Sequence, residues 1–555
     1  MNKHLLFLFI GLFFTKSILF AQTPFNTLDS ISINKIHACA GVHGDMWSNM
    51  VGRESRPGCF FNDGLRKQMN GWSGLWISGY DDAHAIHIAA ETYRYMYIDY
   101  WPGPLPTGGS ITYSASSDWA KIWKINKSTI DTFLTLTSHT ISSTPASILS
   151  WPGKGNMFAT GNGGVALSVT SDMAPFVDLN GDGIYEPLLG EFPDIKGDQA
   201  LWWVINDNGP THDNSNGRPL GVEIHNMAYG WSRGTDVDNV VYYEYDLLNK
   251  SLNNYSNFRF SNWIDVDLGY YYDDFIGCDT SLRLGYQYNG TDDDGAGAGH
   301  PVGSYNQPEL MSGVSFVYLP GDSAGYNVPL GSFTYYNNDY SRIGNPKVDT
   351  EFNNYMRGLT RFGDHYRYDF AGSGIPSTGI GAGPTTNYLF TGNPSDTTSW
   401  NECTCGNLPG DRRFIISSNN FNLNVGEKKK VVMALIVVDS AGGCPNLNFN
   451  KILPIADTAH SAYRKAAGTH PVIPPNTTIP PYPNPAHDII SIETAGHLIN
   501  EESISVYNVI GQKVPTGITQ NQYNYQLKIN HLASGMYYLV YMDGGKMINT
   551  RFIKE

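Results

Sequence analysis

The run "KKKVVMALIVVD" (428–439) places a continuous apolar segment rich in valine after three lysines, a composition typical of a β-strand. Similar strand-like runs recur along the chain, at "GLWISGY" (74–80), "ALWWVIND" (200–207) and "VVYYEYDLL" (240–248). Helical periodicity is scarce, and its best example is "ADTAHSAYRKAAG" (456–468). The sequence therefore predicts a mostly β fold, with a large β-sandwich-rich region over residues 22–470. A subdivision of this region near residue 175 is an option that the sequence leaves open.

The bulk composition fits a folded chain of more than one domain. Its 555 residues are too many for one simple core. Hydrophobic residues make up 41% and charged residues 16%, which argues against extended disorder. The formal net charge is −15, so phosphate backbones would repel the chain. We therefore expect no nucleic-acid partner.

The N-terminus, "MNKHLLFLFIGLFFTKSILFAQ", has the pattern of a secretory signal peptide. A lysine near the start precedes an apolar run over residues 5–14, and Ala21 is the small residue before the predicted cut. The apolar run is too short to cross a bilayer. We therefore expect residues 1–21 to be removed during export, and no membrane-spanning segment to remain in the mature chain.

Six cysteines could form disulfides, because an even number in an exported chain favours bridges over free thiols. They are Cys39, Cys59, Cys278, Cys403, Cys405 and Cys444. Cys39–Cys59 is the natural local pair, and the other four allow three pairings among which the sequence does not choose. A zinc site of His37, Cys39 and His43 is an alternative, although its ligand spacing is less regular than in most zinc sites.

The region around residue 470 marks the clearest domain boundary. Residues 471–481 are rich in proline and predict a stiff, extended linker. Beyond it, runs such as "DIISIE", "YNYQLKI" and "GMYYLVYM" alternate apolar with polar side chains. Residues 482–555 therefore predict a small immunoglobulin-like β-sandwich. The side chains expected on its inner face are Ile504, Val506, Tyr538 and Val540.

The same C-terminal residues carry a more specific signal in "YPNPAHDIISI", "ISVYNVIGQKV", "LASGMYYLVY" and "INTRFIKE". These blocks resemble the type A C-terminal sorting domain of type IX secretion. The resemblance implies a Bacteroidota cell, a dedicated outer-membrane translocon as partner, and a cargo that is released or attached to surface glycolipid. The residues that match the motif are Pro483, Asn484, Pro485, Gly511, Gly535 and Tyr537.

A loop in the cargo, "DLNGDGIYEP" (178–187), has oxygen-bearing residues at alternate positions and a glycine at position 6, as in EF-hand loops. Position 12 is Leu189 rather than a bidentate glutamate, so Glu191 or Asp194 would have to complete the shell. We predict a structural calcium ion, with a metal-free Asx-rich turn as the alternative. The predicted ligands are Asp178, Asn180, Asp182, Glu186 and the backbone carbonyl of Ile184.

A second acidic stretch is "WIDVDLGYYYDDFIGCD" (263–279). Its carboxylates could bind another calcium ion or supply the pair that glycoside hydrolysis needs. Acidic surface turns without a ligand are the alternative. The candidate residues are Asp265, Asp267, Asp273 and Asp274.

Signals for nucleophilic catalysis are absent from the sequence: it has no Gly-Xaa-Ser-Xaa-Gly elbow and no His-Glu-Xaa-Xaa-His motif. Most aromatic rings of a β-rich chain fill its cores. Trp101 follows a tyrosine and precedes "PGPL", so it is the best candidate for an exposed ring that stacks on a sugar.

Blocks of the cargo such as "GLWISGYDDAHAIHIAAETYR" and "DRRFIISSNNFNLNVGE" resemble segments of large secreted Bacteroidota proteins that end in sorting domains. This resemblance adds no catalytic residue. We therefore expect an exported, non-enzymatic protein of the cell surface or its surroundings that acts in adhesion or in glycan or matrix binding. The alternatives are a hydrolase that acts on polysaccharide and a structural component of a surface layer.

Overall fold

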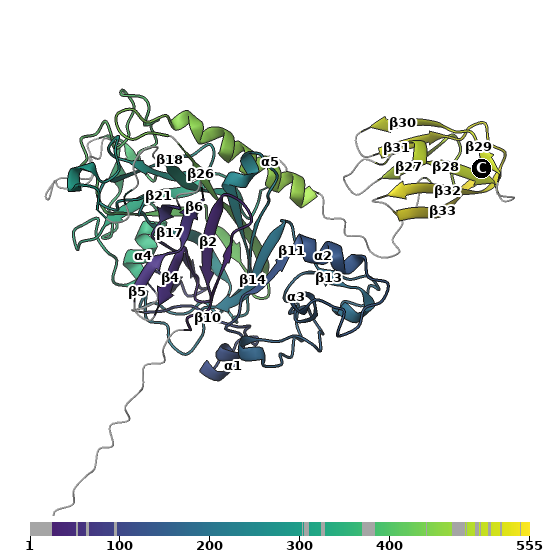
Figure 1. Cartoon of the computed structure of the whole chain (residues 1–555), viewed down its shortest axis with the longest axis horizontal. Helices are drawn as coiled ribbons and strands as arrows, with labels where there is room; N and C mark the ends of the chain where they lie inside the picture. The colour runs from purple at the N-terminus through teal and green to yellow at the C-terminus, as the bar shows by residue number, and fades with distance from the viewer. Residues whose placement is uncertain are drawn as a thin grey trace, which may run out of the picture.

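The computed structural model shows strands layered face to face, with antiparallel ladders in every sheet (Figure 1). It describes residues 25–555 apart from 52–53, 63–65, 94–96, 302–303, 305–309, 323–327, 369–382, 440, 469–482, 484, 494–498, 500, 509–511, 522–523 and 544–545. The predicted signal peptide and the proline-rich linker lie outside the described residues. The prediction of a mostly β chain is confirmed.

The first large sheet has eleven strands, with the order β21-β24-β17-β8-β3-β2-β6-β7 along its main path. Strand β1 pairs with β2, β9 with β8, and β25 with β17. The strands are β1 (Leu28–Ile31), β2 (Ile36–Gly41), β3 (Asp45–Met46), β6 (Cys59–Phe61), β7 (Lys67–Asn70), β8 (Trp72–Tyr80), β9 (Ile86–Ala90), β17 (Tyr255–Asp265), β21 (Leu330–Asn337), β24 (Arg412–Ser418) and β25 (Phe421–Leu423).

The second large sheet has nine strands, with the order β10-β14-β15-β16-β26-β20-β19-β18, and β11 pairs with β14. The strands are β10 (Trp101–Pro102), β11 (Trp123–Asn126), β14 (Gln199–Asn206), β15 (Val222–Gly230), β16 (Val240–Asn249), β18 (Asp274–Asp279), β19 (Leu284–Asn289), β20 (Met311–Tyr318) and β26 (Lys428–Val438).

The two sheets form a sandwich, because one buried cluster takes side chains from both. Strand β26, which contains the valine-rich run, shows how the faces divide. Its residues Val431, Met433, Leu435 and Val437 join the cluster between the sheets. Its residues Val432, Ala434, Ile436 and Val438 join a second cluster on the outer face. Both faces of this strand are therefore buried.

Helices and loops cover the outer faces of both sheets. Helix α5 (Leu453–Gly468) contains the predicted helix and contributes Ala456 and Ala459 to the outer cluster of the nine-stranded sheet. On the eleven-stranded sheet, Phe352 of α4 (Asp349–Met356) packs edge-on against Trp76, with ring centroids 4.9 Å apart. The predicted subdivision near residue 175 falls inside the segment that covers the nine-stranded sheet. Because β11 pairs with β14 across that position, residues on both sides share one core.

The remaining elements of the body are short. The helices are α1 (Tyr113–Asp118), α2 (Lys127–Leu134) and α3 (Ala146–Leu149), with 3₁₀ turns η1 (Asn162–Gly164), η2 (Pro187–Leu189), η3 (Asp236–Asn239), η4 (Ala296–Ala298) and η5 (Phe449–Lys451). The two-stranded ribbons pair β4 (Ser48–Val51) with β5 (Glu54–Pro57), β12 (Phe176–Val177) with β13 (Phe192–Pro193), and β22 (Tyr366–Arg367) with β23 (Thr385–Thr386).

The C-terminal strands form two sheets of their own, of order β27-β31-β30 and β29-β28-β32-β33, around a separate hydrophobic cluster (Figure 1). The elements are β27 (Ile489–Glu493), η6 (Glu501–Ser503), β28 (Ser505–Asn508), β29 (Lys513–Val514), β30 (Gly517–Asn521), β31 (Asn524–Lys528), β32 (Gly535–Asp543) and β33 (Lys546–Lys554).

The predicted inner face of this small sandwich is right for β28 and wrong for β32. Ile504 and Val506 are buried, but Tyr538 is exposed and Val540 is only half-buried. Val506 pairs with Leu539, which places Leu539 on the core side together with the buried Tyr537. A shift of one residue moves every side chain of a strand to the opposite face, and the alternation alone did not fix that register.

Close packing around Gly74 in β8 predicts that a larger residue there destabilises the body. A Cβ atom at this position would lie 2.1 Å from the backbone oxygen of Glu91, which cannot move away. We expect Gly74→Ala to lower the free energy of unfolding by about 2 kcal/mol. Urea unfolding followed by tryptophan fluorescence measures this in the body alone, because residues 401–555 contain no tryptophan.

The matched control is Gly297→Ala, where an added Cβ would meet no atom within 4 Å. We expect this control to change the free energy by less than about 0.5 kcal/mol. Equal unfolding midpoints for the two variants would contradict the packing argument.

Candidate functional site

A cleft of about 840 Å³ lies beside the eleven-stranded sheet, where Trp72, Tyr336 and Phe352 of α4 form part of its wall. Its lining comes from segments far apart in sequence: the start of β8, the chain after β9, residues 213–216, the end of β17 and the start of β24. Ligand sites are usually concave and combine apolar walls with a few polar groups. This cleft has aromatic walls, but its lining contains more charged and amide side chains than such a site usually has.

Strand pairing brings the polar groups of the cleft together. Asp265 is the last residue of β17, and it pairs with Trp72 of β8 on one side and with Arg413 of β24 on the other. Asp267 and Asp411 lie just beyond these strand ends and also line the cleft. The floor of the cleft is therefore a convergence of three strand ends.

Arg413 is the centre of a polar network in the cleft. Its Nε lies 3.1 Å from Oδ1 of Asp265 and donates to the Tyr93 hydroxyl at 2.9 Å. Its Nη1 donates to Oδ1 of Asp411 at 2.6 Å. The Tyr93 hydroxyl in turn donates to Oδ2 of Asp265 at 2.7 Å. This network holds the carboxylate of Asp265 in a fixed position.

Asp265, Asp267 and Asp411 lie close together, and Arg413 is the cation that pairs with two of them. Asp265, Asp267 and Asp411 each place one oxygen within 4.8 Å of the others, the spacing that allows carboxylates to hold one cation. Burial raises the pKa of Asp265 to about 6, with Arg413 opposing the rise and Asp411 adding to it. Burial and then the charges of Asp265 and Asp411 raise the pKa of Asp267.

The predicted second acidic cluster is only half assembled. Asp265 and Asp267 line the cleft, whereas Asp273 and Asp274 do not. Oδ2 of Asp273 accepts from the Gly295 N–H, and Oδ2 of Asp274 accepts from the Leu268 N–H. These two carboxylates organise turns of the backbone. Sequence reasoning missed Asp411, since only the pairing of β17 with β24 brings it near, and no local motif marks it.

The predicted calcium loop forms a tight turn held by its own side chains. Asp178 accepts from the N–H groups of Gly181 and Gly183 at 2.6 and 2.8 Å. Asn180 donates to Asp182 at 3.1 Å and to Glu186 at 2.9 Å, and Asp182 accepts from the Ile184 N–H at 2.8 Å. These bonds form a turn, but the carboxylate oxygens of Asp178, Asp182 and Glu186 do not all lie within 4.8 Å of one another.

Glu191 is one of the two residues, with Asp194, that the sequence offered as a closing ligand. Its side chain is buried, and its two oxygens accept from the N–H groups of Leu179 and Glu186. Burial, followed by the charges of Asp178 and Asp182, raises its pKa. The carboxylate thus already fixes both ends of the loop, and calcium binding here stays a prediction.

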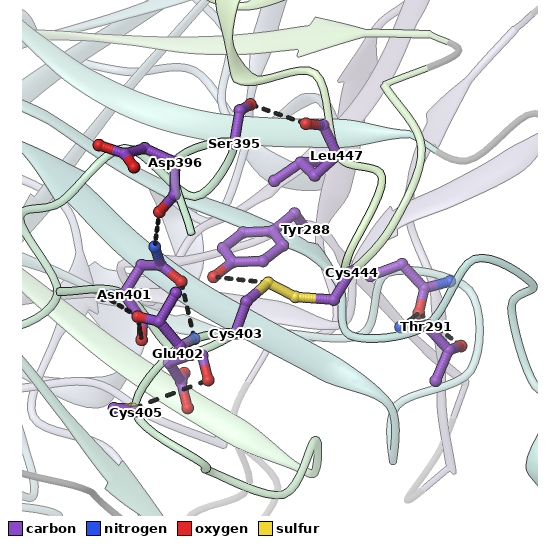
Figure 2. The surroundings of a disulfide bond; sticks show 12 residues. Tyr288, Thr291, Ser395, Asp396, Asn401, Glu402, Cys403, Cys405, Cys444 and Leu447 are labelled. Atoms are coloured by element: carbon purple, nitrogen blue, oxygen red, sulfur yellow. Dashed lines mark hydrogen bonds between the residues drawn. A yellow bond between two sulfur atoms is a disulfide. The ribbon is translucent and has the colours of Figure 1, made fainter. Parts of the chain in front are cut away.

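One disulfide, Cys403–Cys444, is present among the described residues, with Cα atoms 6.0 Å apart (Figure 2). It ties the 401–407 loop to the chain after β26. Figure 2 shows Glu402 next to it in that loop. The Glu402 carboxylate accepts from the Ile276 N–H at 3.0 Å and from Arg412 at 3.1 Å. The disulfide therefore anchors the loop whose Glu402 binds Arg412, the residue before Arg413 in β24.

The predicted pair Cys39–Cys59 is wrong. Both thiols are free, as are those of Cys278 and Cys405. Cys59 pairs with Ala38, so its side chain shares a face with Ala38 and lies opposite to Cys39. The zinc alternative also finds no support, because His43 is bonded to the backbone of Phe25 and Tyr100.

Trp101 is not the exposed ring that its position in a Pro/Gly stretch suggested. It is fully buried in β10, packs edge-on against Phe25 and His43, and donates through Nε1 to the Thr211 backbone oxygen. Its ring lies in a small hydrophobic cluster with Ile98, Leu105 and Ile111. The exposed aromatic side chains near a cavity are tyrosines instead, and they line the cleft.

The residues of the sorting motif lie in or next to the small C-terminal sandwich. Gly535 begins β32, and the Tyr537 ring stacks on Phe552 with centroids 5.6 Å apart. The Tyr537 hydroxyl donates to the Ala533 backbone oxygen at 2.9 Å. Pro483 and Pro485 precede β27, while Asn484 and Gly511 lie outside the described residues.

Comparisons with known proteins identify the C-terminal module and leave the body unassigned. No curated protein matches the chain. The solved structures with weak similarity include a polysaccharide lyase (9% identity, TM-score 0.16, 60% of this chain and 34% of that one) and a protein described as a kojibiose phosphorylase from the human microbiome (8% identity, TM-score 0.24, 77% and 32%). The chain spans about a third of the length of each.

A family model described as the secretion system C-terminal sorting domain matches residues 481–555. This match agrees with the separate core of the C-terminal strands. In the described part of the chain, no helix is both long enough and apolar enough to pass through a membrane. Residues 481–555 are a type IX sorting domain, and the protein that carries them is a secreted protein handled by the type IX secretion machinery.

Proposed function

We propose that this secreted protein binds glycans in the cleft and acts in adhesion or matrix binding at the cell surface or in its surroundings. Three tyrosines that line the cleft, Tyr97, Tyr271 and Tyr340, are 51%, 42% and 69% exposed. Planar rings pack on the apolar faces of sugars while their hydroxyl groups bond to polar atoms. These exposed rings at a concave surface are the observation that carries the proposal.

The polar lining of the cleft supports the same function. Asn338 and Asn345 are hydrogen-bonded to each other at 3.0 Å, and Asn216 donates to the Lys347 backbone oxygen at 3.1 Å. Side chains that are already held in place lose little entropy when a ligand binds. Asn338 also donates to Oδ2 of Asp411 at 3.4 Å, and the remaining amide atoms of Asn216 and Asn345 can bond to sugar hydroxyls. The cleft therefore combines exposed rings with amides whose orientation is fixed before binding.

A hydrolase that acts on polysaccharide is the second candidate function. The close carboxyl groups of Asp265 and Asp267 and the pKa of about 6 at Asp265 favour it, since a general acid needs a raised pKa. Binding without catalysis is the better-supported function, because Tyr93 and Arg413 already hold Asp265. A general acid must keep an oxygen free to protonate the leaving group.

We also propose that the 178–187 loop binds calcium as a structural ion. Support comes from the alternate spacing of Asp178, Asn180 and Asp182 in the loop and from the hydrogen bonds that Asn180 donates to Asp182 and Glu186. Oxygen ligands at such a turn suit Ca²⁺. The buried Glu191 bonds both ends of the loop, so an ion here would stiffen the loop and its link to β13.

The cleft proposal predicts that Tyr340→Ala weakens glycan binding at least about fivefold, since an aromatic contact contributes on the order of 1 kcal/mol beyond its buried area. Retention of the purified protein on immobilised starch, xylan, mannan and chitin measures binding. Release of reducing ends is followed in the same samples. The matched control is Phe362→Ala, because Phe362 is 59% exposed but does not line the cleft.

Glycan binding in the cleft would be overturned if Tyr340→Ala and Phe362→Ala reduced retention equally. It would also be overturned if neither the parent nor the variants were retained on any polysaccharide. Release of reducing ends that Asp267→Asn abolishes would establish the hydrolase instead.

The sorting domain predicts the fate of a truncated chain. A protein that ends at residue 480 lacks the matched module, so we expect it to accumulate in the periplasm of the producing cell. Fractionation of cells and medium, with detection of an internal tag, measures the distribution. Delivery of the truncated chain to the surface or medium in the same proportion as the full chain would refute the assigned role of residues 481–555.

The calcium proposal predicts that added Ca²⁺ raises the thermal unfolding midpoint of the body, because a ligand that binds only the native state stabilises it. The gain is about 2.7 kcal/mol at a hundredfold excess over the dissociation constant. Asp182→Ala should remove this response. Asp172→Asn, which changes an exposed carboxylate outside the loop, should keep it. An unchanged midpoint of the parent protein in Ca²⁺ would contradict the proposal.

A further inference from the structure

The cleft that we propose as a glycan site is strongly acidic. Its lining carries the carboxylates of Asp213, Asp265, Asp267 and Asp411, against the two cations Lys347 and Arg413. Oδ1 of Asp213 accepts from the Ile98 N–H at 3.0 Å, so this carboxylate is fixed in the wall. The carboxylates of the lining outnumber its cations two to one. Asp265, Asp267 and Asp411 lie together on the floor of the cleft.

The two cations are already engaged. Arg413 bonds Asp411 and forms an ion pair with Asp265, so a single guanidinium faces three carboxylates. Lys347 places its ammonium group 4.1 Å from the centre of the Tyr340 ring, at one of the exposed tyrosines. Asp267 therefore shares the charge of Arg413 with Asp265 and Asp411 and is only partly balanced.

Two further observations show that the floor of the cleft is built to hold these carboxylates. Oδ1 of Asp265 lies 3.1 Å from the Arg413 Nε as an ion pair and accepts no geometrically good hydrogen bond from the described residues, although Asp265 is 93% buried. Gly71 makes room for Asp267, since a Cβ at position 71 would lie 2.1 Å from Oδ2 of Asp267. An alanine there would displace the carboxylate from its place in the cleft.

We infer that the cleft selects glycans that carry a protonated amine, with Asp267 and Asp411 as the groups that receive it. This inference rests on the proposed glycan binding. An ammonium group between these carboxylates forms charge-assisted hydrogen bonds, while the sugar ring packs on the exposed tyrosines. Glycans built from uronic acids meet like charge in a site of low dielectric, and the cleft rejects them.

The amine selection is tested by calorimetric titration of the purified full-length protein with three oligosaccharides of equal length. These are oligomers of glucosamine, of N-acetylglucosamine and of galacturonic acid, each measured with a chelator present. We expect the glucosamine oligomer to bind about tenfold more tightly than the acetylated one, because acetylation removes the charge. The galacturonic acid oligomer should bind most weakly.

Asp267→Asn keeps the shape of the side chain and removes its charge. It should abolish the preference for the amine while leaving affinity for the acetylated oligomer within about twofold. Asp172→Asn is the matched control, since it removes an exposed carboxylate outside the cleft and should keep the full preference. A fluorescence unfolding curve checks that each variant is folded. If a variant does not fold, the affinities of the three oligosaccharides for the parent protein still test the inference.

The outcomes separate this inference from the function on which it rests. Equal affinity for the amine and acetylated oligomers, or a preference that survives in Asp267→Asn, overturns the amine selection and leaves glycan binding intact. Tight binding of the galacturonic acid oligomer in a repeat titration, with Ca²⁺ in place of the chelator, overturns it in favour of a metal bridge. Failure of all three oligomers, together with all the polysaccharides of the retention assay, overturns both proposals.

Discussion

Burial of the central strands on both faces is the constraint on which the body depends. In β26 successive side chains enter two different hydrophobic clusters, one between the sheets and one on the outer face. A strand of this kind cannot leave either side to water without losing the apolar burial that stabilises it. The outer layers follow from this requirement. Helix α5 and the 113–198 segment cover one sheet, and α4 covers part of the other.

The cleft lies at the edge of the layer that α4 forms on the eleven-stranded sheet. Helix α4 packs on the eleven-stranded sheet through Phe352, and the same side chain forms part of the cleft wall. Just beyond the last paired residues of β17 and β24 the chain leaves the core, so charged side chains can lie at these strand ends without full burial. Alternation along β24 separates two arginines. Arg412 bonds Glu402 in the loop anchored by the disulfide, and Arg413 faces the carboxylates of the cleft. Packing of the body thus positions the polar network.

Local sequence patterns predicted the features that depend on neighbouring residues. Valine-rich runs indicated the strands, and the C-terminal blocks identified the sorting domain. The turn chemistry of Asp178 and Asp182 is visible in the loop sequence itself. Features that depend on register or on distant pairing were missed. Asp411 joins Asp265 only through the β17–β24 ladder, and alternation in β32 could not say whether Tyr537 or Tyr538 faces inward. For Trp101, flanking proline and glycine suggested exposure, although the ring is buried in a small hydrophobic cluster.

The charge of the cleft floor acts against the stability of the body, which is why we assign it to function rather than to packing. Burial raises the pKa of Asp265 from 3.8 to about 6, so the folded chain holds this proton more tightly than the unfolded chain does. The corresponding stability is complete below about pH 4 and is lost as the pH rises through about 6. Asp267 is shifted in the same direction. At pH 7, above its pKa of about 6, Asp265 therefore carries a negative charge that folding disfavours and that Arg413 partly balances. Neutral side chains of similar shape would pack there without this cost, whereas a ligand with positive charge recovers it on binding.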